Sequence, residues 1–89
     1  MDIQAAVDEL IHLAEQIGVD IRREALGGEG GGLCVLRGRR VLFIDTYADL
    51  QTRYDKTLAA LAGLPEIEAH YIRPDLRDAL ERARREAGA

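Results

Sequence analysis

The sequence LCVLRGRRVLFID (residues 33–45) predicts a β-hairpin at the centre of the fold. Two apolar runs flank the pair Gly38-Arg39, and glycine at the first position of a two-residue turn favours type II′ geometry. This turn pairs Leu36 with Val41 and continues outward in the same register. Because side chains alternate along a strand, one face carries Cys34, Leu36, Val41 and Phe43, and the other carries Leu33, Val35, Leu42 and Ile44.

Both faces of this predicted hairpin are apolar. An antiparallel sheet with one solvated face shows alternating apolar and polar residues instead. We therefore expect both faces to be covered, either by the helices of the chain or by a second copy. A chain of 89 residues forms one domain (residues 1–89) with a thin core, which favours a homodimer. The competing arrangement is a monomer with helices on both faces.

The segments before the hairpin predict a helix and an edge strand. Residues 2–17 carry an apolar stripe with helical spacing, and Gly18 ends it. Residues 19–26 (VDIRREAL) place Val19 and Ile21 on one face and charged side chains on the other. This alternation is typical of a half-exposed strand at the edge of a sheet.

The segments after the hairpin predict two more helices. Thr46 is the expected cap of the second helix, which ends at Gly63. Residues 67–72 are a candidate short strand, and Pro74 begins the third helix. The predicted order is α-β-β-β-α-(β)-α. The fold class is therefore α+β, with a small, mostly antiparallel sheet whose central hairpin is covered by helices.

Composition and charge exclude several classes of protein. Twelve basic and 16 acidic residues leave a net charge of −4, which does not indicate a nucleic-acid-binding protein. The first 18 residues lack the basic region of a signal peptide, and no apolar run approaches the roughly 20 residues of a membrane span. The single Cys34 rules out an intramolecular disulfide and fits the cytoplasm. We expect a cytoplasmic protein that binds neither nucleic acid nor membrane.

The glycine loop, Gly27–Gly32 with Glu29 in it, has two interpretations. A phosphate-binding P-loop ends in Gly-Lys-Ser/Thr, and a dinucleotide fingerprint has a third glycine where Leu33 stands. Neither motif is complete, and no side chain of the loop stiffens it. We expect a flexible connector, and the alternative is a loop that grips a ligand.

Three arginines at the hairpin tip, Arg37, Arg39 and Arg40, also have two interpretations. They grip a phosphate or a carboxylate on a partner, or they keep an exposed hairpin soluble. Other reactive side chains have structural explanations: Cys34 lies in mid-strand, and Asp45 and Asp49 lie where carboxylates cap helices. Two separate histidines make a poor metal site. We expect no catalytic residue, metal or cofactor.

Residues 31–64 resemble the zinc-motif region of the ImmA/IrrE-type metallopeptidases. Thr57, Leu58 and Ala59 match the start of their helix T-L-A-H-E-L-G-H, but Ala60, Leu61 and Leu64 stand where that family has its two histidines and its glutamate. The zinc motif is missing, so the resemblance implies no peptidase activity. The whole chain resembles an uncharacterised family of small bacterial proteins that share a Gly-Gly-x-Cys hairpin and a Pro-x-x-Arg helix start (residues 74–77).

The sequence favours a non-enzymatic interaction or regulatory protein that acts as a homodimer and binds an unknown protein partner. The alternative is a small-molecule or peptide-binding domain that uses the Gly27–Gly32 loop, with Glu29, and the arginine-rich hairpin tip. A hydrolase with an unconventional site is a third interpretation.

Overall fold

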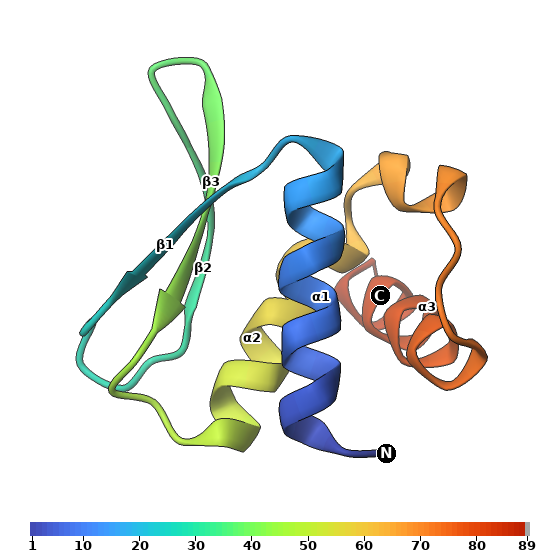
Figure 1. Ribbon diagram of the computed structural model, residues 1–89, viewed down its shortest axis with the longest axis horizontal. Helices are drawn as coiled ribbons and strands as arrows, with labels where there is room; N and C mark the ends of the chain where they lie inside the picture. Colours follow the sequence, from blue (N-terminus) through green and yellow to red (C-terminus); the bar gives the residue numbers. More distant parts are fainter. Residues whose placement is uncertain (89) are drawn as a thin grey trace.

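A computed structural model describes residues 1–88 of the chain (Figure 1). Its elements are α1 (Ile3–Ile17), β1 (Asp20–Glu24), β2 (Gly31–Leu36), β3 (Arg39–Asp45), α2 (Leu50–Ala62), the 3₁₀ helix η1 (Pro65–Ala69) and α3 (Pro74–Ala87). The predicted α+β class is confirmed. The three helices and the three strands also follow one another in the predicted order.

The sheet is mixed. Its strand order is β1-β3-β2, so β3 lies in the middle and the other two strands form the edges. β2 and β3 pair antiparallel, as predicted, but β1 and β3 pair parallel. The expectation of a mostly antiparallel sheet is therefore wrong for the β1–β3 pair. The physical reason is the order of the strands, because β1 lies beside β3 and not beside β2. The chain reverses its direction between β1 and β2 and again between β2 and β3, so β1 and β3 run the same way.

The hairpin turn lies one residue earlier than the sequence predicts. Its central residues are Arg37 and Gly38, with φ angles of 53° and 78°. Two positive φ angles define a type I′ turn, whose twist matches that of the strands and so outweighs the strain on Arg37. Leu36 now pairs with Arg39, and every other partner shifts by two residues. A shift of two leaves each side chain on its predicted face.

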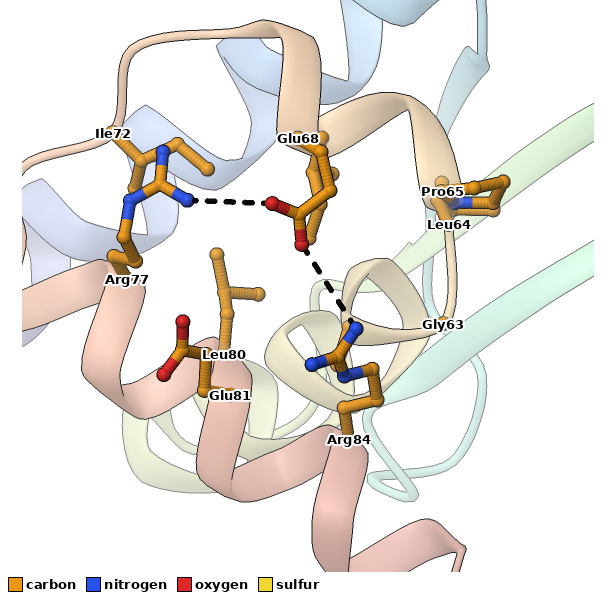
Figure 2. A pocket seen from close by; sticks show the side chains of 11 residues that line it. Gly63, Leu64, Pro65, Glu68, Ile72, Arg77, Leu80, Glu81 and Arg84 are labelled. Atoms are coloured by element: carbon orange, nitrogen blue, oxygen red, sulfur yellow. Dashed lines mark ion pairs between the residues drawn. The ribbon is translucent and has the colours of Figure 1, made fainter.

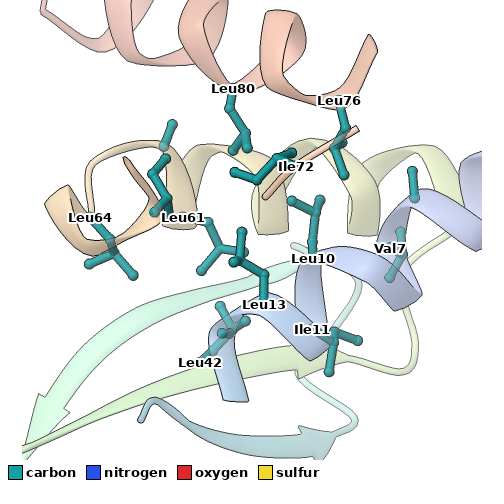
Figure 3. Packing of buried hydrophobic residues seen from close by; sticks show 14 of the residues in the cluster. Val7, Leu10, Ile11, Leu13, Leu42, Leu61, Leu64, Ile72, Leu76 and Leu80 are labelled. Atoms are coloured by element: carbon teal, nitrogen blue, oxygen red, sulfur yellow. The ribbon is translucent and has the colours of Figure 1, made fainter. Parts of the chain in front are cut away.

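All helices of the described chain lie on one side of the sheet (Figure 1). α1 and α2 pack on the face that carries Leu42 and Ile44, and α3 packs on α2. Figure 3 shows Leu42 beneath α1, with Leu61, Leu76 and other leucines of the helical layer above it. The competing arrangement, a monomer with helices on both faces of the hairpin, is therefore wrong for residues 1–88, because none of their helices lies on the second face of the sheet.

Two other local predictions are wrong. The cap of α2 is Asp49, whose carboxylate accepts a hydrogen bond of 2.7 Å from the backbone N–H of Thr52, so the helix begins later than a Thr46 cap requires. Residues 67–72 form no strand: Pro65 begins η1, and an irregular segment joins it to α3. Ile67 and Ile72 are both buried in the helical core, which an odd spacing of five does not allow on one face of a strand.

Candidate functional site

The four candidate contact residues do not gather at one place. Glu29 lies in the loop before β2, and the three arginines lie in or beside the turn after it, so the length of β2 separates them (Figure 1). A six-residue strand is roughly 20 Å long. Within one copy of the chain, the glycine loop and the hairpin tip therefore form two separate surfaces.

Two of the three tip arginines already hold carboxylates. Arg39 donates two hydrogen bonds to Asp20, of 2.6 and 2.7 Å, and this contact lowers the pKa of the Asp20 carboxyl. Arg40 pairs with Glu66 at 2.7 Å, which lowers the pKa of Glu66 in the same way. Arg37 is exposed and, within residues 1–88, has no ion pair. It is the tip arginine that remains available to a partner.

The glycine loop is held by a buried carboxylate. The loop crosses the end of β3, where Asp45 has 0% of its surface exposed. One oxygen of Asp45 accepts hydrogen bonds from Leu26 N and Tyr47 N, both at 2.9 Å. The other accepts from Gly28 N at 2.7 Å and Gly30 N at 3.0 Å. The loop that the sequence predicts to be a flexible connector is therefore bonded to the end of β3 through Gly28 and Gly30.

Burial and hydrogen bonding act on Asp45 in opposite directions. Desolvation raises the pKa of the carboxyl, but the four backbone N–H donors together outweigh it and lower the pKa to about 2. The carboxylate thus stays ionised and has little capacity left to accept a proton from a substrate. The sequence analysis explains Asp45 as a helix cap and misses its role in holding the loop. The signal for that role is an aspartate at the end of a strand together with a glycine-rich loop, because no bulky side chains keep the backbone N–H groups of such a loop from a carboxylate.

Glycine is required at two positions of this loop. At Gly31, with φ 92°, a β-carbon would overlap the carbonyl oxygen of Phe43 on β3. At Gly30, with φ 100°, it would overlap the side chain of Lys56 on α2. The glycines therefore let the loop lie close to β3 and α2 and aim its N–H groups at Asp45.

The second face of the sheet, which we call the open sheet face, carries Cys34, Leu36, Val41 and Phe43. Cys34 and Leu36 are exposed, Phe43 is half-buried, and Val41 is buried among its neighbours. The guanidinium of Arg22 lies over the Phe43 ring, 5.5 Å from its centre. Cys34 is therefore not the enclosed small hydrophobe that its mid-strand position predicts.

The two edges of the sheet differ in charge. β1 (DIRRE) carries four charged residues out of five, a pattern that discourages pairing with another chain. β2 (GGLCVL) carries none in six residues. Two of its side chains, Val35 at 64% and Leu36 at 43%, are among the most exposed large apolar residues of the described chain. β2 is an apolar edge without the usual protection.

Two of the hollows on the helical side lie beside the segment that joins η1 to α3. One, of about 200 Å³, lies between η1 and α3, where Arg77 and Arg84 flank Glu68 at 3.7 and 3.9 Å (Figure 2). It is smaller than most small-molecule sites. The other is a shallow groove of about 570 Å³ between α1 and the start of α3, beside His12 and Tyr71. Arg77, Arg84 and Glu68 in the first hollow have a structural explanation as surface ion pairs.

Among residues 1–88, no cluster of three or more histidine, cysteine or carboxylate side chains has the arrangement of a metal site. None of the helices described is both long and apolar enough to cross a bilayer. The chain matches no protein-family model, no curated protein and no solved structure.

Proposed function

We propose that this chain is a non-enzymatic interaction protein of the cytoplasm, which acts as a homodimer and shares its sheet with a second copy. The observation that carries the proposal is the contrast between the two sheet edges. The β1 edge is charged, whereas β2 is apolar and exposed beside an open sheet face that no helix of the described residues covers. Exposed apolar edges of this kind pair with other strands.

The use of the reactive side chains supports a non-enzymatic role. Asp45 is fully buried, and its carboxylate oxygens accept hydrogen bonds from four backbone N–H groups of the chain itself. Asp49 caps α2. Arg39 and Arg40 hold carboxylates of the same chain. These residues stabilise the fold, and their partners leave them little freedom for acid–base chemistry.

Sedimentation equilibrium over a concentration series tests the homodimer. Pairing through a six-residue edge buries a small area, so we expect a weak dimer and a series that reaches about 1 mM. The variant Leu36→Glu adds a charge to β2 where the side chain is already exposed, and it should shift the protein towards monomer. Leu42, at 0% exposure, is unsuitable because a charge there would unfold the helical core.

Tyr71→Glu is the matched control. Tyr71 is 87% exposed and lies on the helical side of the molecule, away from β2. This variant should dimerise like the unmodified chain. A chain that remains a monomer throughout the series would overturn the proposal, as would a dimer that Leu36→Glu leaves as stable as Tyr71→Glu does.

A further inference from the structure

Two opposite charges at the two ends of β2 form no ion pair within residues 1–88. Glu29 is exposed in the loop just before the strand, and Arg37 is exposed in the turn just after it. Neither forms an ion pair within the described chain, whereas Arg39 and Arg40 do. The length of β2 keeps Glu29 and Arg37 from reaching each other in one copy.

The hairpin register shows which backbone groups of β2 point outward. Leu36 and Arg39 close the two-residue turn, and the residues that close such a turn exchange both of their hydrogen bonds. Along an antiparallel pair, hydrogen-bonded and non-hydrogen-bonded residues alternate. Leu33 and Val35 therefore direct their N–H and C=O groups away from β3, towards the free edge. These groups are the ones that a further strand could bond.

We propose that β2 pairs antiparallel with β2 of a second copy, about a two-fold axis at Leu33, and so joins the two sheets into one of six strands. This inference rests on the proposed homodimer and specifies its geometry. In this register Leu33 faces Leu33 of the second copy through the outward backbone groups, and Val35 faces Gly31, where β2 begins. The register therefore lays the loop that carries Glu29 beside the turn that carries Arg37 of the second copy.

Charge complementarity therefore selects a second copy as the occupant of this edge. The antiparallel arrangement places each unpaired arginine beside an unpaired glutamate, and the two-fold axis repeats the contact at the other end. The apolar residues of the strand lie between these two ion pairs. The charged β1 edge offers no comparable match, because it carries Arg22 and Arg23 side by side and pairs its Glu24 with Arg22.

Charge reversal tests the contact. Glu29→Arg and Arg37→Glu should each raise the Kd of the dimer about tenfold, because two exposed ion pairs become repulsions. The double variant Glu29→Arg/Arg37→Glu restores opposite charges and should regain most of the affinity. Arg85→Glu, on the exposed end of α3, is the control and should leave the Kd unchanged.

Cysteine cross-linking tests the register directly. In a Cys34→Ser background, Leu33→Cys should form a disulfide-linked dimer under mild oxidation, since the two-fold axis places the two Leu33 residues opposite each other, within disulfide reach. Arg85→Cys in the same background should not. A dimer by sedimentation that shows neither the restored affinity nor the cross-link would overturn this geometry and leave the homodimer standing. A monomer throughout would overturn both.

Discussion

The substitution Asp45→Asn should loosen the glycine loop and destabilise the whole chain. Asparagine has nearly the shape of aspartate but only one acceptor oxygen and an NH₂ group in place of the other. The two carboxylate oxygens of Asp45 each accept two backbone hydrogen bonds. In either orientation of the amide, two backbone N–H groups therefore face a donor instead of an acceptor.

The magnitude follows from those two N–H groups. A buried donor left without its acceptor costs about 1–3 kcal/mol, so the free energy of unfolding should fall by about 2–6 kcal/mol. A domain of 89 residues has a total stability of about 4–13 kcal/mol. Asp45→Asn should therefore remove a large share of it. Urea unfolding followed by circular dichroism measures this loss.

A second readout separates the loop from the rest of the fold. Hydrogen exchange of the Gly28 and Gly30 amides should be slow in the unmodified chain, because Asp45 accepts from both, and fast in the variant. Asp49→Asn is the matched control, since asparagine caps helices as well as aspartate does, and should change little. An unfolding free energy for Asp45→Asn within about 0.5 kcal/mol of the unmodified chain would refute the reasoning.

The pKa of Asp45 adds a pH dependence with a definite sign. Its folded value, about 2, lies below the ordinary value of 3.8, so the unfolded chain binds the proton more tightly. The stabilisation from the ionised carboxylate is complete above the unfolded pKa. It should be lost progressively as the pH falls from about 4 to about 2, and the loss over that range should be smaller in Asp45→Asn.

Two further substitutions test the packing. Gly31→Ala should lower the free energy of unfolding by more than about 1 kcal/mol, because its β-carbon overlaps the backbone of β3 at a positive φ. Gly63→Ala, which meets open space at an ordinary φ, should stay within about 0.5 kcal/mol in the same urea titration. Thr57→Val should raise the melting temperature, because the Thr57 hydroxyl is buried without a hydrogen-bond partner. An equal rise from exposed Thr46→Val would contradict that explanation.

Local sequence patterns predicted most of the fold. The helix predicted over residues 2–17 and the start of α3 at Pro74 depend on neighbours three or four residues away, and the structure has this helix at Ile3–Ile17, ended by a left-handed Gly18. The two apolar hairpin faces also survived the shift of register, because that shift was even. Pairings between residues far apart in the sequence could not be predicted from such local patterns. The parallel pairing of β1 with β3 leaves no local trace in either strand.

The candidate site shows the same difference between local features, which the sequence predicts, and long-range contacts, which it does not. The sequence analysis identified Glu29 and the tip arginines as charges near an apolar hairpin. That identification does not depend on the distance between Glu29 and the arginines in the fold. The sequence could not show that Asp20 and Glu66 hold Arg39 and Arg40, because those carboxylates lie 19 and 26 positions away in the chain. For the same reason the partners of Asp45, 15 to 19 positions earlier in the loop, were missed.

The position of the glycine loop across the end of β3 also has a consequence for the order in which parts of the chain fold. The β2–β3 hairpin closes between neighbours and should form early, whereas β1 must find β3 over a separation of 21 residues, from Asp20 to Val41. The hydrogen bonds from the loop to Asp45 span 15 to 19 residues, so we expect them to form after the hairpin closes. Interactions that form late in folding mainly slow unfolding. We therefore expect Asp45 to lengthen the lifetime of the assembled sheet more than it speeds its formation.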